Sequence, residues 1–286
     1  MLMSTLRPLL AAVTLLAVSA ADAQPRSVDI PLGNGTVALT LIELKPGTFT
    51  MGSPKEEAHR RTNETQHAVT LSKPFWLGRT EVTQAQWQAV TGKPSPAKNQ
   101  GNEQLPVDNV SWDEATQFCQ TLTEQARKAG HIPANARFTL PTEAQWEYAC
   151  RAGTGTALNN GKNITSTQGR CANLDEVAWY YPRQTNGYGY FTSVGQFRPN
   201  AWGLYDMHGN ALEWCLDRMT YANMSDATDP KGDLSRTERV LRGGGCGNGY
   251  GYARHCRSAY RYTCNPSYRS YSDYFGFRLL VLPAAE

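Results

Sequence analysis

Apolar and polar positions along the first half of the chain alternate in short stretches, which is typical of strands. Residues 39–44 and 47–52 predict a strand, a turn and a second strand. Residues 67–71 alternate as a half-buried strand does, and the apolar residues 75–77 indicate another. We interpret residues 24–40, which contain a turn at 33–35, as a leader into the fold.

Three short helices are predicted by capping boxes, in which a hydroxyl caps a helix and a longer side chain three residues later bonds back. The pairs are Thr83 with Gln86, Ser111 with Glu114, and Thr142 with Gln145. Each helix carries aromatic residues on its expected inner face, and we expect them to pack in the core. These aromatic residues are Trp87, Trp112, Phe118, Trp146 and Tyr148.

The remainder of the chain is poor in regular patterns. Residues 153–200 and 216–238 read as polar loops, and a loop tract this long requires a metal, a disulfide or a ligand to order it. The sequence has no internal repeat and no clear linker. We therefore predict a single α+β domain, rich in coil, over residues 41–286.

The C-terminal stretch, residues 239–282, has an unusual composition. It holds seven of the 14 tyrosines, together with many Gly, Asn, Ser and Arg residues and few aliphatic ones. Tyrosine offers large contact area with few torsions to freeze, and Ser, Gly and Asn offer adaptable hydrogen bonds. Two interpretations remain open, a ligand-binding surface and an irregular structural coil.

Composition and the N-terminus restrict the class of protein. A net charge of +3 in 286 residues gives no reason to expect nucleic-acid binding. Residues 1–23 have the pattern of a cleavable signal peptide, with Arg7, an apolar run and a small-residue cleavage site. No Cys follows that site, and no later apolar run is long enough to span a membrane. We expect a secreted or periplasmic monomer.

Seven cysteines in an exported chain favour disulfides, although the odd number leaves at least one thiol unpaired within the molecule. No C-x-x-C motif occurs, so zinc-ribbon and thioredoxin-like sites are not expected.

Eight short motifs occur in order along the chain. They are MGS at 51–53, EVT at 81–83, PV at 106–107, VSW at 110–112, LPTEAQWEYA at 140–149, GLYDMHGNALEW at 203–214, RGG at 242–244 and GFR at 276–278. This ordered set resembles the formylglycine-generating-enzyme, or sulfatase-modifying-factor, family. The resemblance runs from about residue 42 to residue 281 and implies a coil-rich C-type lectin-like fold.

The catalytic members of that family use two cysteines five positions apart, shortly after the Gly-Gly motif, to bind copper and oxidise a substrate cysteine. Counted from that motif, the two positions fall on Asn248 and Ala253 here. A copper cofactor is therefore not expected. The resemblance also implies a disulfide between Cys150 and Cys256. The alternative is that both cysteines are buried free thiols.

The resemblance further implies one or two structural Ca²⁺ sites, each made from side-chain and main-chain oxygens as this hard cation requires. The first site comprises Asp206, Gly209, Ala211 and Glu213, and the second comprises Asn173, Leu174, Asn186 and Tyr188. The alternative for the first site is that Glu213 only caps or pairs with a neighbouring group. The second site departs from the family, which has an acid where this chain has Asn186.

Two functions remain in competition. The C-terminal stretch resembles the variable proteins of diversity-generating retroelements, a non-catalytic subset of the family that binds a protein or surface ligand. The alternative is a periplasmic oxidoreductase that forms formylglycine or matures a siderophore with other residues. The expected ligand-binding residues form one exposed concave patch: Asn248, Tyr250, Tyr252, His255, Tyr262, Asn265, Tyr268, Ser270, Tyr271, Asp273 and Tyr274.

Overall fold

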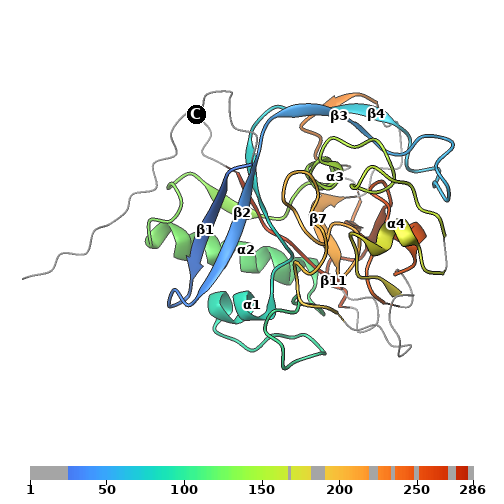
Figure 1. Cartoon of the computed structure of the whole chain (residues 1–286). Helices are drawn as coiled ribbons and strands as arrows, with labels where there is room; N and C mark the ends of the chain where they lie inside the picture. Colours follow the sequence, from blue (N-terminus) through green and yellow to red (C-terminus); the bar gives the residue numbers. More distant parts are fainter. Residues whose placement is uncertain are drawn as a thin grey trace, which may run out of the picture.

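The computed structural model describes residues 25–166, 169–181, 191–218, 225–232, 236–247, 251–269 and 275–282. Within these ranges, three small sheets and a few helices are joined by long irregular segments (Figure 1). The predicted signal peptide, residues 1–23, lies outside the described residues.

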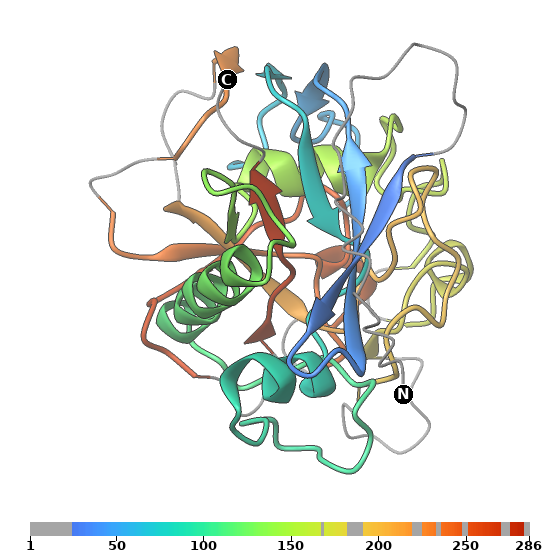
Figure 2. The same cartoon turned by 90° about the vertical axis from the view of Figure 1, so that its left-hand side faces the viewer.

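The largest sheet has five strands in the order β1-β2-β5-β12-β6, and every neighbouring pair is antiparallel. The strand nearest the C-terminus, β12, lies between β5 and β6, so it completes the sheet that the N-terminal strands begin (Figure 2). The strands are β1 (Ser27–Leu32), β2 (Val37–Leu44), β5 (Phe75–Gly78), β6 (Arg137–Thr139) and β12 (Leu280–Leu282).

Residues 27–40 correct the leader interpretation, because they form β1 and the start of β2 within this sheet. The expected turn at 33–35 joins the two strands, and Gly33 and Gly35 have positive φ there. Val28, Ile30 and Leu32 alternate with Ser27, Asp29 and Pro31 along β1. Ile30 and Leu32 are buried. This period of two was the signal that the leader interpretation overlooked.

Two further sheets carry the rest of the strands. A three-stranded sheet, in the order β3-β4-β8, contains β3 (Gly47–Met51), β4 (His67–Leu71) and β8 (Ala227–Thr228). A four-stranded sheet, in the order β10-β9-β7-β11, contains β7 (Leu212–Arg218), β9 (Arg239–Arg242), β10 (Tyr262–Cys264) and β11 (Phe275–Gly276).

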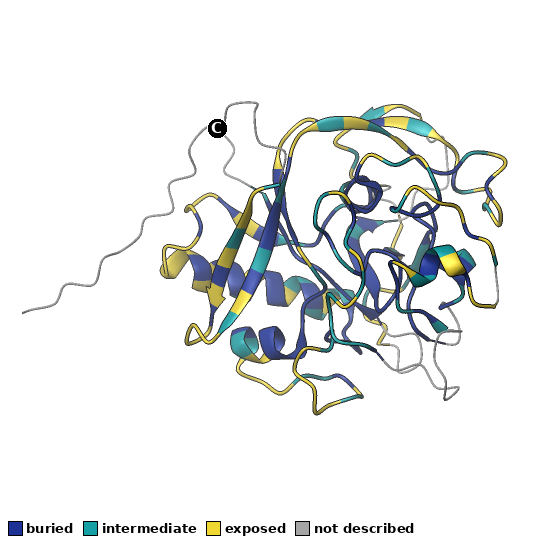
Figure 3. Ribbon diagram, in the orientation of Figure 1, coloured by how far each residue is buried: buried dark blue, intermediate teal, exposed yellow. Residues whose placement is uncertain are grey.

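All three predicted capping boxes are present, at α1 (Gln84–Thr91), α2 (Trp112–Lys128) and α3 (Glu143–Arg151). Of the aromatic residues expected in the core, Trp87, Phe118, Trp146 and Tyr148 are buried, and Trp112 is half-buried. The inner faces of α1 and α2 are buried and their outer faces are exposed (Figure 3). The long loop tract contains only the short helix α4 (Ala172–Asp175) among its described residues.

Candidate binding surface

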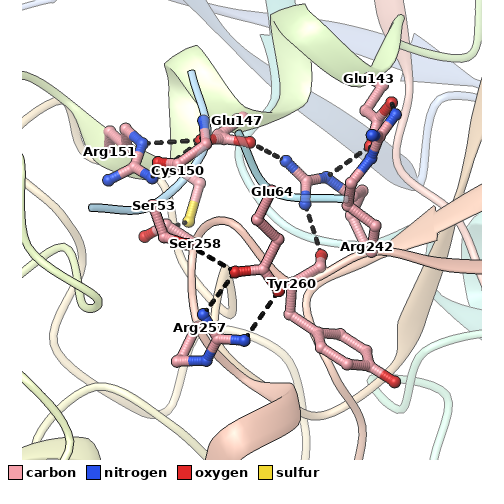
Figure 4. Close-up of polar contacts among 12 residues, drawn as sticks. Ser53, Glu64, Glu143, Glu147, Cys150, Arg151, Arg242, Arg257, Ser258 and Tyr260 are labelled. Atoms are coloured by element: carbon pink, nitrogen blue, oxygen red, sulfur yellow. Dashed lines mark hydrogen bonds and ion pairs between the residues drawn. The ribbon is translucent and has the colours of Figure 1, made fainter. Parts of the chain in front are cut away.

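The C-terminal stretch is attached to the rest of the molecule through arginines whose side chains are buried and paired with glutamates (Figure 4). A buried guanidinium is stable only when carboxylates and carbonyl oxygens satisfy its donors. Between its short strands, the stretch is therefore held by these side-chain contacts to the rest of the molecule. The four arginines are Arg242, Arg257, Arg261 and Arg278.

Arg242 ends β9 and is fully buried. Its Nη2 donates to Glu147 on α3, its Nη1 donates to the carbonyl of Tyr260, and its Nε lies 3.6 Å from a carboxylate oxygen of Glu143. The Glu147 carboxylate also accepts from Arg151 Nε at 2.9 Å and from the Gly52 amide at 2.8 Å. Burial raises the pKa of Glu147, but Arg151 and Arg242 outweigh this effect and lower it.

Arg257 and Arg261 fix the next part of the stretch, which contains the 3₁₀ turn η2 (Ala253–His255), onto the loop before β4 and onto the start of α3. Arg257 donates to Glu57 at 2.6 Å and to both oxygens of Glu64 at 2.8 Å. Arg261 donates to both oxygens of Glu143 at 2.5 Å. These paired contacts are the geometry in which a guanidinium binds carboxylates most strongly.

Four of the expected ligand-binding residues are described and reach the surface at least in part. Tyr252 is half-buried, and its ring lies 5.2 Å from that of Tyr181 and beneath the guanidinium of Arg254. Tyr262 is half-buried against the core, and Asn265 is exposed. Tyr268 is 46% exposed, the largest value for a bulky apolar or aromatic side chain among the described residues.

His255 does not belong to an exposed patch, because only 4% of it is accessible to solvent. Its ring packs between Tyr252 and Tyr260, and the Arg254 Nε donates to its Nε2. Burial lowers the pKa of His255 to about 3, and the neighbouring arginines reinforce this shift. Composition suggested a contact residue, but tertiary packing makes His255 part of the support.

The other predicted contact residues fall outside the described residues, so the single concave patch stays a prediction. They are Asn248, Tyr250, Ser270, Tyr271, Asp273 and Tyr274.

Two of the cysteines that follow the Gly-Gly motif, Cys246 and Cys256, are poorly placed for thiolate chemistry, whereas Cys264 is half-buried. Cys246 and Cys256 are fully buried, and burial raises the pKa of both thiols well above the ordinary range. Gly244 lies against Cys256, where an added Cβ would come within 2.7 Å of the Sγ atom. A buried protonated thiol is a weak nucleophile and a weak metal ligand.

Cys150 and Cys256 are both buried thiols, and the predicted disulfide is not formed in the structure. His208 contacts both residues. Its Nδ1 donates to the Cys256 carbonyl at 2.7 Å, and its Nε2 accepts from the Asn159 amide and lies 3.7 Å from Cys150 Sγ. Burial lowers the pKa of His208 to about 4, which keeps the ring neutral. The Cys150–Cys256 pairing stays a prediction.

The loop expected to hold the first Ca²⁺ has a constrained backbone. Asp206 and Asn210 have φ near +60°, and a side chain at Gly209 would lie 2.3 Å from the Trp179 carbonyl. Glu213 forms an ion pair, which was the alternative to its being a Ca²⁺ ligand. Its two carboxylate oxygens accept from Arg278 at 2.6 and 2.7 Å. Trp146 Nε1 also donates to Glu213, at 2.8 Å.

A second acid beside this loop, Glu81, was missed by the sequence reasoning although it lies in the EVT motif. Glu81 and Asp206 are both buried, and each has one carboxyl oxygen that no N–H or O–H group of another residue type satisfies. The two carboxyl groups are close enough to interact with each other. Burial raises the pKa of both groups, and the negative charges of Asp206 and Glu213 raise that of Glu81 further. Orphaned carboxyl oxygens fit a hard cation such as Ca²⁺. Within the described ranges, no three His, Cys, Asp or Glu side chains converge as a metal site.

The second predicted Ca²⁺ site is only partly described. The Asn173 side chain donates to the Asn163 carbonyl, and the Asn173 carbonyl accepts from Asn160. Leu174 is buried in a small apolar cluster. Asn186 and Tyr188 lie outside the described residues.

The fold and the site together define a coil-rich α+β scaffold that holds an irregular, tyrosine-rich stretch on buried ion pairs. The chain belongs to the sulfatase-modifying factor enzyme 1-like family, whose domain model matches residues 34–282. This membership confirms the resemblance inferred from the motifs and the C-type lectin-like fold that it implied. No helix in the described part of the chain is long and apolar enough to cross a membrane.

Curated relatives include formylglycine-generating enzymes. The chain is 30% identical to the enzyme of Mus musculus over 77% of this chain and 55% of that protein. It is 33% identical to the enzyme of Thermomonospora curvata over 76% of this chain and 67% of that protein. The chain therefore spans about half the length of the mouse relative.

Two solved structures match nearly the whole chain. Treponema denticola variable protein 1 superposes with a TM-score of 0.72 and 30% identity, over 90% of this chain and 99% of that one. PvdO from Pseudomonas aeruginosa superposes with a TM-score of 0.70 and 25% identity, over 91% of this chain and 99% of that one.

Proposed function

We propose that this chain is an exported, non-catalytic ligand-binding protein that presents its tyrosine-rich C-terminal stretch as the binding surface. One observation carries the proposal: the stretch divides into two sets of side chains. The arginines are buried and paired with glutamates, whereas Tyr252, Tyr262, Asn265 and Tyr268 are half-buried or exposed. The similarity to a variable protein over 90% of the chain supports the same role.

The physical basis is pre-organisation. The backbone between the tyrosines is fixed by contacts to the loop before β4 and to α3, so binding does not have to order it. A surface already fixed in its binding conformation loses less entropy when a ligand arrives. Aromatic side chains with two torsions then contribute contact area and a hydroxyl each.

The cysteines support a role without oxidase chemistry. The two positions that match the family's catalytic pair by counting are Asn248 and Ala253, and the nearby thiols of Cys246 and Cys256 are buried. Copper-loaded protein incubated with a cysteine-containing peptide should consume no oxygen above background. Copper-dependent turnover of that peptide would instead favour the oxidoreductase function.

The binding surface is tested with a triple variant, Tyr252→Ser, Tyr262→Ser and Tyr268→Ser, on a protein and glycan microarray. We expect the pattern of bound spots seen with the wild type to disappear while the melting temperature falls by only a few degrees. Tyr205→Ser is the matched control, since Tyr205 is a half-buried tyrosine outside the stretch. An unchanged array pattern, or unfolding of the triple variant, would contradict the proposal.

We propose in addition that Ca²⁺ stabilises the scaffold at Asp206, with the main-chain oxygens of Gly209 and Ala211 that the family resemblance implies. The orphaned oxygens of Asp206 and Glu81 support this location. Glu81 would then supply a carboxylate that the resemblance did not indicate, since Glu213 already pairs with Arg278.

A further inference from the structure

A cavity of about 810 Å³ opens beside the start of β9, between the start of α2 and the ends of β4, β7 and β12. Its volume lies within the range of small-molecule sites. Seven charged residues line it, and positive charge exceeds negative charge by five to two. The cations are Lys73, Arg137, Arg218, Lys231 and Arg239, and the acids are Asp217 and Asp229.

Arg239 is the most constrained of these cations. Its guanidinium lies 3.9 Å from the centre of the Trp112 ring, and its Nη1 donates to the Leu216 carbonyl at 3.0 Å. Its Nε–H is buried and has no hydrogen-bond acceptor among the described residues. A buried donor without an acceptor costs stability unless a ligand or water satisfies it.

The strand pairing places a second positive charge close to Arg239. Arg239 on β9 lies directly opposite Arg218 on β7. Like charges at directly opposed positions of an antiparallel pair are destabilising. Burial lowers the pKa of Arg239, and the charge of Arg218 lowers it further. No carboxylate lies within ion-pair distance of Arg239 in the described part of the chain.

The two acids of the cavity are already engaged. Asp229 accepts from the amide and hydroxyl of Ser72. Asp217 accepts from the Glu143 amide at the start of α3, and burial raises the pKa of Asp217 to about 7. At neutral pH, Asp217 therefore carries only part of a negative charge. The positive charge of Arg239 is left for a bound anion to neutralise.

The uncharged part of the lining is mostly apolar, with Thr139, Thr142 and Gln145 as its polar members. Trp112 and the side chains of Leu71, Leu140, Leu216 and Leu282 line the same space. A cavity with an apolar wall and a few convergent charged groups suits an amphipathic small molecule rather than a bare inorganic ion. Arginine binds carboxylate and phosphate groups in the same bidentate way.

We propose that this cavity binds a small organic anion, whose carboxylate or phosphate pairs with Arg239 and whose apolar body packs against Trp112 and the leucines. The site is separate from the C-terminal binding surface and does not depend on it. The protein would thus carry a second, small-molecule site next to a surface for larger ligands.

The test is isothermal titration calorimetry of the purified protein with three probes: phenyl phosphate, benzoate and inorganic phosphate. At least one of the aromatic anions should bind one to one, and more tightly than inorganic phosphate does. Their relative affinities distinguish phosphate from carboxylate as the preferred group. Binding should weaken as salt rises, because the pair is partly accessible to solvent.

Arg239→Gln should weaken that binding by about tenfold or more, since it removes a charge-assisted pair. Arg79→Gln is the matched control, because Arg79 also lies over an aromatic ring, that of Tyr205, and lies outside the cavity. The double variant Lys73→Gln with Arg137→Gln alters only exposed rim residues, so it stays informative if Arg239→Gln folds poorly.

We expect the rim variant to weaken binding and to reduce its salt dependence, while Lys45→Gln, an exposed lysine outside the cavity, leaves both unchanged. The proposal is overturned if neither aromatic anion binds, or if inorganic phosphate binds as tightly as both. It is also overturned if the Arg239 and rim variants bind as the wild type does.

Discussion

Replacing Glu147 by Gln tests whether buried ion pairs hold the C-terminal stretch in place. The side chains of Glu147 and Arg242 are 1% and 0% exposed, and that of Arg151 is 4% exposed. The substitution keeps an acceptor oxygen but removes the charge, and it can turn an amide N–H₂ toward two guanidinium groups. Removing one partner from a buried pair typically costs about 3–5 kcal/mol, because the remaining charge is left uncompensated. Arg242 still has Glu143 at 3.6 Å, so we expect the free energy of unfolding to fall by about 3 kcal/mol, near the lower end of that range.

The assay is urea unfolding followed by tryptophan fluorescence. Glu43→Gln is the control, since the Arg26–Glu43 pair is 3.8 Å long and its side chains are 41% and 20% exposed. Exposed pairs contribute about 0–1 kcal/mol, so this control should unfold almost as the wild type does. The pKa of Glu147 is lowered in the folded state. Its contribution to folding stability is therefore present at neutral pH and disappears as pH falls through that pKa. The reasoning is refuted if Glu147→Gln costs less than about 1 kcal/mol at pH 7.

Three further predictions concern the disulfide, the metal and the pH dependence of stability. Peptide mapping of protein produced in an oxidising compartment, under non-reducing conditions, should recover Cys150 joined to Cys256. The chain-entropy model values this bridge at about 4–5 kcal/mol, and two free thiols would contradict the pairing. EDTA should lower the melting temperature of the wild type but not of Asp206→Asn or Glu81→Gln, because a metal that binds only the folded state stabilises it. A wild-type melting curve that EDTA leaves unchanged would exclude the site. The raised pKa of Asp217 means that its contribution to stability is present below pH 3.8 and is lost as pH rises through about 7. The wild type should therefore lose up to about 4 kcal/mol relative to Asp217→Asn between pH 4 and pH 8, measured by urea unfolding; parallel pH profiles would contradict this.

The parts of the fold that the sequence predicted depend on neighbouring residues. A capping box is a contact between residues three apart, so Thr83, Ser111 and Thr142 were correctly placed before three helices. Strand β4 was predicted with its observed bounds, because its alternation is local as well.

The parts that the sequence could not predict depend on residues far apart in the chain. Arg257 pairs with Glu64, which lies 193 positions earlier, and nothing in either local sequence indicates the partner. The insertion of β12 between β5 and β6 is likewise set by packing of the whole domain. His255 was grouped with its tyrosine neighbours by composition, whereas its burial follows from the contacts of Tyr252 and Tyr260.

The arrangement of charge explains how one chain can tolerate an irregular, polar C-terminal stretch. Such a segment buries few aliphatic side chains, so hydrophobic packing alone would leave it poorly fixed. Arginines placed between the tyrosines supply contacts that reach across the molecule, to α3 and to the loop before β4. These contacts depend on buried glutamates and not on the identity of the neighbouring exposed residues. Substitutions at Asn265 or Tyr268 should therefore alter what the surface binds while leaving the anchoring pairs, and with them the fold, intact.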